Sequence, residues 1–323
     1  MSLHAAKTAN TFAADELFNE EVAEILAGLT AKQKRISPKY FYDQRGSELF
    51  DQICTLPEYY PTRTEFRIMR DHLPEIARLV GPRVSVIEFG AGSNAKARQL
   101  LSRLEEPVAY VPVEISGEYL AEQAEELARD FPGLSVIPVV ADFTKPFALP
   151  KHPTMPDRNL VFFPGSTIGN FTRVEALNLL EVMGGEAQQG GALLLGVDLI
   201  KDRRLVREAY NDSRGVTAEF NLNVLSHLNS GLGADFRPGR FRHEAVYDEA
   251  HDRIEMRLVA REDHTVRIAD ATIWFERGEY IITEYSHKYS IDGFRTLTRQ
   301  AGLVPQAVWT DPDDLFSVHY LTV

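Results

Sequence analysis

The sequence lacks the residues that mark several classes of protein. Cys54 is its only cysteine, so an internal disulfide is impossible, and no group of Cys and His has the spacing of metal ligands. No run of about 18 apolar residues could span a membrane, and the beginning of the sequence lacks the basic and apolar regions of a secretory signal. We therefore expect a cytoplasmic protein with no metal ion.

The charged residues argue against polyanionic partners. Asp and Glu outnumber Lys and Arg by 47 to 35, which gives a net charge of -12 at pH 7, and no block of Lys and Arg occurs. Such a chain has no basic stretch to bind phosphates or anionic lipids. We expect neither a nucleic acid nor a membrane as partner, but a monomer that binds a small molecule.

The middle of the sequence alternates between helical and strand patterns. Apolar residues recur at helical spacings, and the segments between them are short apolar runs rich in β-branched residues. Five such units predict an α/β fold with a doubly wound parallel sheet. We expect strands at residues 84–89, 108–113, 134–140, 160–163 and 192–197, and helices at 66–80, 96–104 and 118–131.

A fourth helix is predicted after the strand at 160–163. Thr172 and Glu175 have the spacing of a capping box, so the helix should begin just after Thr172. The glycines at 184–185 should end it. The residues expected to face the core are Val174, Leu177 and Leu180.

The pattern changes after about residue 200. Helical segments lie around Leu205 and 220–228, and then Ile254, Met256 and Leu258 alternate with polar Glu255 and Arg257, which predicts a half-buried antiparallel strand. Two final strands should close the first sheet as an antiparallel edge. The other elements expected here are strands at 271–275, 280–286, 303–309 and 316–323 and a helix at 291–301.

We therefore predict an α/β fold with a second α+β domain inserted before the last two strands. The first domain would comprise residues 63–200 and 288–323, and the second would comprise residues 1–62 and 201–287.

The end of the first predicted strand has a nucleotide-binding pattern. Residues 90–95 read Gly-Ala-Gly-Ser-Asn-Ala, and Glu114 ends the next strand, where a carboxylate can accept hydrogen bonds from ribose hydroxyls. Glu88 before the glycines, and Asp142 with Phe143 after the third strand, favour S-adenosylmethionine, because an acid and an aromatic ring suit adenine. A plain structural turn and a dinucleotide site are the alternatives.

The stretch LVFFPGSTIGNF at residues 160–171 narrows the function further. A buried strand breaks there into a loop in which Gly165 and Gly169 permit close approach to a ligand and Asn170 offers an amide. Ligands of open α/β sheets bind just past such strand ends, although a glycine-rich turn alone would have the same pattern.

These segments resemble the histidine Nα-methyltransferases of ergothioneine biosynthesis. The resemblance implies a Rossmann-like class I methyltransferase sheet with a separate substrate-binding domain. It also implies that three methyl groups pass from S-adenosylmethionine to the α-amine of L-histidine, which gives hercynine. The matching segments are residues 38–43, 46–51, 56–65 (LPEYYPTRTE), 165–170 (GSTIGN), 195–202 and 215–221.

The resemblance also implies roles for single residues. Asn170 and Tyr210 would hold the substrate carboxylate, and Tyr42 and Tyr59 would line the pocket near the amine. Tyr42, Asn170 and Tyr210 are the positions expected to be catalytic. The other substrate-binding positions implied are Gly165, Met256, Glu284 and Ser286, and the cofactor-binding positions are Gly90, Gly92, Lys96, Glu114, Asp142 and Phe143.

The proposed reading of the imidazole agrees with the residue chemistry. Glu284 and Ser286 are two apart on a predicted strand, so their side chains project from one face. A carboxylate and a hydroxyl can bind the two ring nitrogens and distinguish histidine from other flat amino acids. Taken alone, Glu284 fits a solvated strand face equally well, and Met256 fits a core filler.

Three other functions are compatible with these patterns. A betaine synthase for tyrosine or tryptophan would keep the reaction, and a non-catalytic S-adenosylmethionine-binding regulator would keep only the cofactor site. A nicotinamide oxidoreductase is the most distant of the three. His227, His287 and His319 lie on separate predicted elements, so we assign none of them as a general base.

Overall fold

The computed structural model describes residues 18–145, 147–150 and 154–323, which form two compact units. The sheet unit comprises residues 50–212, 247–254 and 285–323. The smaller unit comprises the described residues up to Leu49 together with residues 213–246 and 255–284. Within the described ranges, no helix combines the length and the apolar character that a membrane span needs.

An eight-stranded sheet forms the centre of the sheet unit. Its strands are β1 (Val84–Phe89), β2 (Ala109–Glu114), β3 (Ser135–Val136), β4 (Val139–Val140), β5 (Arg158–Phe163), β6 (Ala192–Asp198), β12 (Val304–Thr310) and β13 (Phe316–Thr322). Their order is β12-β13-β6-β5-β1-β2-β3, with β4 also pairing with β2. The pairs β12–β13 and β13–β6 are antiparallel and the other pairs are parallel, so the predicted parallel sheet and its antiparallel edge are confirmed.

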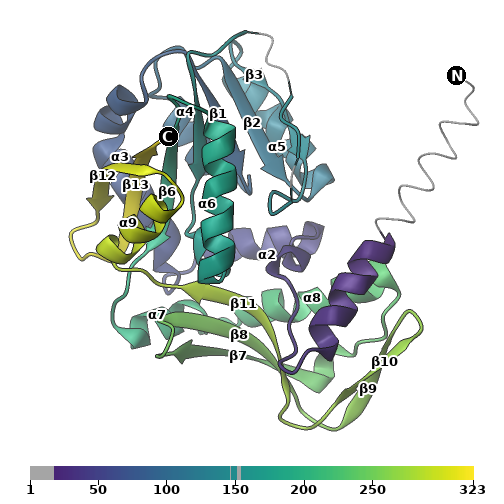
Figure 1. Ribbon diagram of the computed structural model, residues 1–323. Helices are drawn as coiled ribbons and strands as arrows, with labels where there is room; N and C mark the ends of the chain where they lie inside the picture. The colour runs from purple at the N-terminus through teal and green to yellow at the C-terminus, as the bar shows by residue number, and fades with distance from the viewer. Residues whose placement is uncertain (1–17, 146, 151–153) are drawn as a thin grey trace, which may run out of the picture. The chain divides into compact units, whose positions relative to one another are not determined.

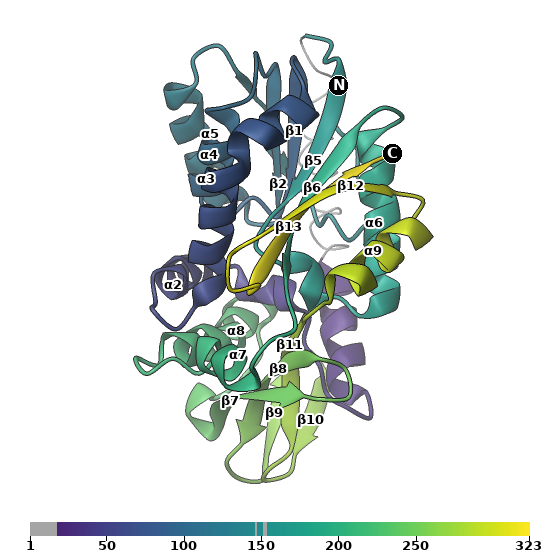
Figure 2. The ribbon, with the colours of Figure 1, turned by 90° about the vertical axis from the view of Figure 1, so that its left-hand side faces the viewer.

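Helices cover both faces of this sheet (Figures 1 and 2). The helices α3 (Tyr60–Val80), α4 (Ala95–Leu101) and α5 (Gly117–Asp130) pack on one face, and α6 (Arg173–Ala187) and α9 (Ile291–Gln300) pack on the other. In β1, Val84 and Val86 face the first layer, whereas Ile87 and Phe89 face the second. The central strands are therefore apolar on both sides, which explains why their sequences read as continuous apolar runs.

The third predicted strand is wrong as a single element. The segment 134–140 forms two short strands, β3 and β4, because Pro138 lies between them and has no backbone N–H to donate to a neighbouring strand.

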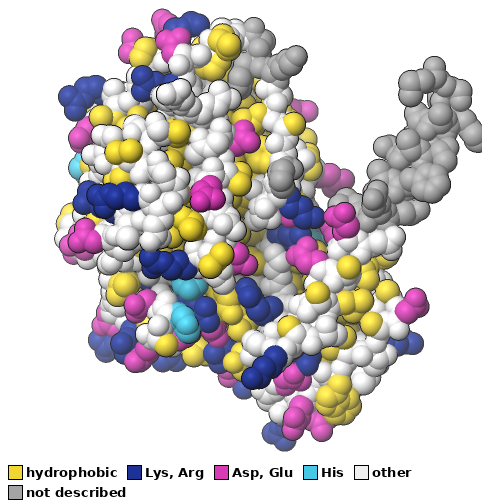
Figure 3. Space-filling model, viewed as in Figure 1, with side chains coloured by type: hydrophobic (Ala, Val, Ile, Leu, Met, Phe, Trp, Pro, Cys, Tyr) yellow, Lys and Arg dark blue, Asp and Glu magenta, His cyan; other side chains and the backbone are white. Residues whose placement is uncertain are grey.

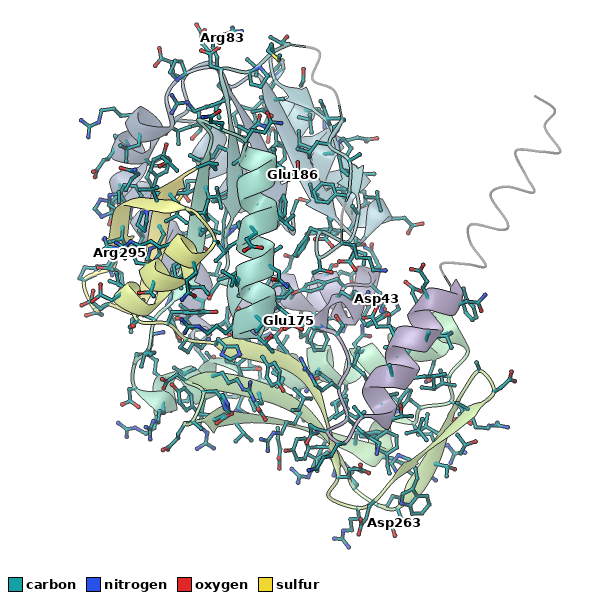
Figure 4. All side chains as sticks on the ribbon, in the orientation of Figure 1. Asp43, Arg83, Glu175, Glu186, Asp263 and Arg295 are labelled. Carbon is teal, nitrogen blue, oxygen red and sulfur yellow. The ribbon has the colours of Figure 1, made fainter. Side chains whose placement is uncertain are left out.

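The helix α6 begins as predicted but differs in its buried face and its end. Thr172 and Glu175 form the capping box, and Glu175 marks the first turn in Figure 4. Val174 is 70% exposed, and the helix continues through 184–185 to Ala187, so the predictions for these positions are wrong. The helix is apolar on several sides, and its core face is formed by Ala176, Leu179, Leu180, Met183 and Ala187.

Helices and short antiparallel strands make up the smaller unit. Residues 18–30 are helical, and the strands β9 and β10 form a hairpin. The other elements with residues in this unit include a three-stranded sheet of order β11-β8-β7. Their bounds are η1 (Pro38–Phe41), α2 (Gln44–Cys54), α8 (Val216–Leu232), η3 (Pro238–Arg240), β7 (Phe241–Asp248), β8 (Arg253–Ala260), β9 (His264–Ile268), β10 (Ala271–Phe275) and β11 (Tyr280–His287).

The predicted alternation in β8 is wrong for its polar side. Glu255 is buried, and one of its carboxylate oxygens accepts a hydrogen bond from Arg257 Nη2 at 2.6 Å. The Arg257 guanidinium lies 4.2 Å from the centre of the Tyr280 ring. The strand is therefore covered on both faces, and its charged residues are paired rather than solvated.

Charged side chains of both signs are interspersed over the faces of the two units that Figure 3 shows. On those faces the acidic side chains are not gathered in one block.

Candidate active site

The candidate site lies at the carboxyl ends of the parallel strands of the sheet unit. Because β5, β1 and β2 are parallel neighbours, the segments that follow them leave the sheet at one edge. The segments are Gly90–Gly92 after β1, Glu114 at the end of β2 and the loop after β5.

A tight glycine turn follows β1. Gly90 has a φ of +68°, and the backbone N–H groups of Gly90 and Ala91 both donate to the Val113 carbonyl, at 2.9 and 3.1 Å. A Cβ atom on Gly90 would lie 3.4 Å from the Phe143 ring. The turn is thus held against the end of β2 and close to a second predicted cofactor residue.

Glu114 ends β2, and Asp142 and Phe143 follow β4, with the Phe143 ring close to this turn. Glu114 Oε1 accepts a hydrogen bond from the backbone N–H of Ile115 at 2.7 Å, and burial raises the pKa of the Glu114 carboxyl. Asp142 Oδ1 accepts from the backbone N–H of Thr144 at 3.0 Å. The Phe143 ring lies 5.7 Å from the Phe89 ring, which fixes its position near the glycines.

The loop after β5 is held by a buried carboxylate from α3. The backbone N–H of Gly165 donates to Glu65 at 2.9 and 3.0 Å, and Glu65 also forms an ion pair with Lys96. A Cβ on Gly196 of β6 would lie 1.9 Å from Glu65 Oε1, so any side chain at this strand position would displace the Glu65 carboxylate. Glu65 therefore joins Gly165 and Lys96, two residues that the sequence assigned to substrate and cofactor.

The next residues of the loop are fixed just as closely. Ser166 has a φ of +59°, and its Oγ accepts a hydrogen bond from the backbone N–H of Asp198 at 2.9 Å. A Cβ on Gly169 would lie 2.8 Å from the His287 carbonyl oxygen. The short helix η2 (Thr167–Asn170) then ends at half-buried Asn170. The loop is thus anchored on both sides of the position predicted to bind substrate.

At the end of β6, one buried carboxylate serves several partners. Asp198 forms ion pairs with Lys288, at 2.7 Å, and with Lys201, and it accepts a hydrogen bond from the Tyr60 hydroxyl at 2.7 Å. We call these four residues the Asp198 cluster. It contains one acid and two ammonium groups and therefore has an excess of one positive charge.

The pKa values of the Asp198 cluster reflect this arrangement. Burial alone would raise the pKa of the Asp198 carboxyl, but Lys288 and Lys201 together outweigh it and hold the pKa below its usual range. Burial lowers the pKa of Lys201 to about 8. The pKa of Lys288 is raised despite its burial, chiefly by the charge of Asp198. Asp198 is therefore ionised at neutral pH.

Lys288 connects this cluster to predicted substrate residues. Its ammonium group donates to Ser286 Oγ at 2.7 Å and to the Tyr210 hydroxyl at 3.3 Å. Tyr210 follows α7 (Arg203–Ala209), and its hydroxyl lies 2.7 Å from Ser286 Oγ. The ring of Tyr59 meets the Tyr210 ring edge to face, with centroids 6.1 Å apart. Three predicted substrate residues are thus in direct contact.

The other predicted substrate residues belong to the smaller unit. The Tyr42 ring packs edge to face against Phe220, with centroids 6.0 Å apart. Met256 is buried, and its carbonyl accepts a hydrogen bond from Thr283 Oγ1 at 3.1 Å. Glu284 is half-buried on β11. In the described part of the chain, no group of three or more His, Cys, Asp or Glu side chains could hold a metal ion.

Sequence reasoning missed Glu65, Asp198, Lys201 and Lys288. Asp198 occupies the same kind of position as Glu114, the carboxyl end of a buried parallel strand, and this position was a usable signal. Glu65 ends the LPEYYPTRTE stretch. Nothing in the local pattern around Lys288 indicates that its side chain is buried.

The chain was compared with known families and proteins. The profile of the family described as "Histidine-specific methyltransferase, SAM-dependent" matches residues 21–323. A histidine N-alpha-methyltransferase of Mycolicibacterium smegmatis is 41% identical over 310 residues, which cover 94% of this chain and 95% of the relative. The enzyme of the same name from Mycobacterium tuberculosis is 38% identical, covering 89% and 90% of the two chains. Ergothioneine biosynthesis protein 1 of Neurospora crassa is 30% identical, covering 87% of this chain and 32% of that protein.

The family profile spans almost the whole chain, and the matches cover 95% and 90% of the two mycobacterial relatives. The predicted family resemblance is therefore confirmed. The chain belongs to the family of S-adenosylmethionine-dependent, histidine-specific methyltransferases.

Proposed function

We propose that the chain transfers three methyl groups from S-adenosylmethionine to the α-amine of L-histidine. The product would be Nα,Nα,Nα-trimethylhistidine (hercynine), in the first step of ergothioneine biosynthesis. The observation that supports this most directly is the contact of Tyr59, Tyr210 and Ser286 at the carboxyl end of β6, beside the positive Asp198 cluster. An excess positive charge and several hydroxyl groups suit an amino-acid carboxylate and ring nitrogens.

The turn after β1 fits the cofactor. Gly90 has a φ of +68°, which favours glycine, so the backbone itself, without a side chain, can approach a nucleoside. Glu114 at the end of β2 suits the ribose hydroxyls, and Asp142 with Phe143 suits the adenine amino group and ring. When bound, S-adenosylmethionine supplies the methyl group from its sulfonium. The residues proposed to hold it are Gly90, Gly92, Lys96, Glu114, Asp142 and Phe143.

The substrate residues act by positioning. Methyl transfer needs a neutral amine in line with the methyl group, so hydroxyl and amide groups serve better than a strong nucleophile. We assign Asn170 and Tyr210 to the carboxylate and Tyr42 and Tyr59 to the amine. Aromatic faces would stabilise the quaternary ammonium product by about 0.5–2 kcal/mol. Glu284 and Ser286 would bind the imidazole, with Met256 and Gly165 as further substrate contacts.

A betaine synthase for tyrosine or tryptophan is the second candidate. Ser286 is buried and Glu284 is half-buried, and a carboxylate with a hydroxyl can bind the two edge nitrogens of an imidazole, whereas a phenol or an indole ring has only one polar group at its edge. Histidine is therefore the better fit. We further propose that the protein is a cytoplasmic monomer that binds neither nucleic acid nor membranes.

The test is to incubate the purified protein with S-adenosylmethionine and each of histidine, tyrosine and tryptophan, and to follow the products by mass. We expect a gain of three methyl groups on histidine alone. Methylation of another amino acid would overturn the assignment of the imidazole pocket. If no amino acid is methylated while S-adenosylmethionine still binds, the regulator hypothesis replaces the proposal.

A second experiment tests the assignment of Glu284. We expect Glu284→Ala to lower kcat/KM for histidine by about 10- to 150-fold, the range expected when a charged hydrogen-bond acceptor is lost. Binding of S-adenosylmethionine should change much less, and an equal loss of both would count against the assignment. Glu276→Ala, an exposed acid in the turn between β10 and β11, is the matched control.

A further inference from the structure

We propose that Lys288 is a positioning residue that makes Ser286 a hydrogen-bond donor toward the substrate, and that the enzyme therefore binds histidine with a neutral imidazole. The inference rests on the proposed function, because it assumes that Ser286 faces the imidazole. It adds a residue and a protonation state that the proposed function does not specify.

The Lys288 ammonium group uses all of its hydrogen-bonding capacity inside the protein. Its three N–H bonds have three acceptors, namely Asp198 Oδ2 at 2.7 Å, Ser286 Oγ at 2.7 Å and the Tyr210 hydroxyl at 3.3 Å. An ammonium group only donates, so both hydroxyl oxygens accept from it. The Lys288 side chain is 1% exposed, so water does not compete for these bonds.

The hydrogen bond between the Tyr210 and Ser286 hydroxyls has one donor and one acceptor. Tyr210 and Ser286 lie 2.7 Å apart, and only one of them can donate to the other. A phenol is the stronger acid and hence the better donor, so we assign the donated hydrogen to Tyr210, which then contacts the substrate carboxylate beside Asn170 without donating to it. Ser286 Oγ then accepts from both Lys288 and Tyr210, and its own hydrogen is directed to a third group. Ser286 is 3% exposed, so water does not take this hydrogen, and in the proposed complex the imidazole accepts it.

The neutral and the protonated imidazole ring differ in what they can offer to Ser286. A neutral imidazole has one N–H, which Glu284 would accept, and one bare nitrogen, which can accept from Ser286. An imidazolium has two N–H groups and would place one of them against the Ser286 O–H. Lys288 therefore disfavours the protonated form of the ring.

The groups around Lys288 leave a clear pH window for this effect. Asp198 is held ionised by two lysines, and burial lowers the pKa of His287 to about 4, so it is neutral above pH 5. Lys201 has its pKa near 8. The free imidazole of histidine, with a pKa of about 6.5, therefore titrates between these groups. The titratable groups facing Lys288 are Asp198 of β6, Lys201 after it, Tyr60 of α3, Tyr210 after α7, Tyr247 of β7, and His287 of β11.

The test measures the dissociation constant of histidine by calorimetry between pH 5 and 7.5 with S-adenosylhomocysteine present. Binding is measured rather than rate, because turnover also depends on the amine proton. In the unaltered protein, we expect the affinity to fall about tenfold per pH unit below the imidazole pKa. In Lys288→Met, Ser286 is released to accept a hydrogen bond, and the fall should shrink to threefold or less.

Two further variants separate positioning from structural damage. Lys288→Arg keeps a cation beside both hydroxyls and should retain the tenfold slope. Ser286→Ala leaves the Lys288–Asp198 pair intact and should also flatten the slope, so the proposal can be tested even if Lys288→Met fails to fold. A tenfold slope in both Lys288→Met and Ser286→Ala, with merely weaker binding, would overturn the inference.

A non-titrating analogue controls for the protein's own groups. β-(2-thienyl)alanine has a flat ring without ionisable nitrogen, so its affinity should stay constant from pH 5 to 7. A tenfold fall in the affinity for this analogue per pH unit would show that groups of the protein cause the pH dependence, and it would overturn the inference. If the unaltered protein binds no histidine at any pH, the proposed function itself fails, which is a different result from a slope that Lys288 does not control.

Discussion

Two buried ion clusters in the sheet unit differ in their charge balance. In the first, Glu65 faces a single cation, Lys96, and its remaining hydrogen-bonding capacity is used by the Gly165 N–H. In the second, Asp198 faces both Lys201 and Lys288. The first cluster is neutral and holds the loop after β5 in place, and we call the contact of Glu65 with Lys96 and Gly165 the Glu65 strut. The second keeps an excess positive charge, which the proposed binding of an anionic substrate group would use.

The comparison also explains why two buried carboxyl groups differ in pKa. Burial raises the pKa of Glu88 in β1 to about 7, and Lys96 opposes this only in part because it already serves Glu65. At Asp198 the same burial is outweighed by two lysines, and the pKa is lowered. The number of cations per acid, and not burial alone, decides the protonation state.

The largest expected effect is the loss of the shared acid. In Asp198→Asn two buried ammonium groups lose their counter-ion, and we expect the free energy of unfolding to fall by about 3–5 kcal/mol. Urea denaturation measures it. Asp202→Asn is the matched control, because Asp202 is an exposed N-cap of α7 and asparagine caps equally well, so its change should stay below about 0.5 kcal/mol. Equal effects of the two substitutions would show that the lysines do not depend on Asp198.

The second prediction concerns the pH dependence of stability near the neutral cluster. Glu88 has a raised pKa in the folded state, so the folded protein binds more protons than the unfolded chain between pH 4.5 and 7. Its contribution to stability is therefore present at low pH and is lost as the pH rises through 7.

Glu88→Gln removes this loss. We compare the free energy of unfolding of the variant with that of the unaltered protein at each pH. This difference should shift in favour of the variant by about 2–3 kcal/mol from pH 5 to pH 8. Denaturation at the two pH values measures the change, and the amide keeps an acceptor for the Tyr110 hydroxyl, which donates to Glu88 at 2.5 Å. A stability difference that is the same at both pH values would mean that Glu88 is ionised throughout.

The third prediction tests the Glu65 strut directly. In Gly196→Ala the new Cβ would lie 1.9 Å from Glu65 Oε1, so the carboxylate must move away from Gly165 and Lys96. We expect a loss of about 1–3 kcal/mol in the free energy of unfolding, as for other overpacked sites. Binding of S-adenosylmethionine should also weaken, which titration calorimetry would measure. Unchanged cofactor affinity would separate Glu65 from the cofactor site.

Sequence patterns predicted the parallel sheet well, because its strands are buried on both faces and read as unbroken apolar runs. They predicted the helix α6 less well. Apolar residues lie on several of its sides, so Val174, Leu177 and Leu180 fitted one helical stripe, although only Leu180 is fully buried, Leu177 is partly buried and Val174 is exposed. The strand β7 was missed, since Arg242, His243 and Glu244 interrupt its apolar pattern.

Residues of the candidate site could be named from the sequence where they belong to one motif. Residues that act through contacts between distant segments could not. The glycine turn at Gly90 and the contact partners Tyr210 and Ser286 could be named from motifs and family resemblance. Lys288 could not, because its role depends on Asp198, which lies on another strand, and no spacing in the sequence relates the two. Buried charge pairs are properties of the fold, and only the three-dimensional arrangement reveals them.

The smallest expected effect is a stabilisation, and it comes from another glycine-to-alanine substitution. Gly185 lies in the exposed interior of α6, and a Cβ there meets no atom within 4 Å. Alanine is the better helix former, so Gly185→Ala should raise the free energy of unfolding by about 0.5–1 kcal/mol and leave cofactor binding unchanged. A rise in the thermal midpoint would measure it. If both glycine variants instead destabilised the protein equally, the cost at Gly196 would reflect a general intolerance of the core helices and strands and not the displacement of Glu65.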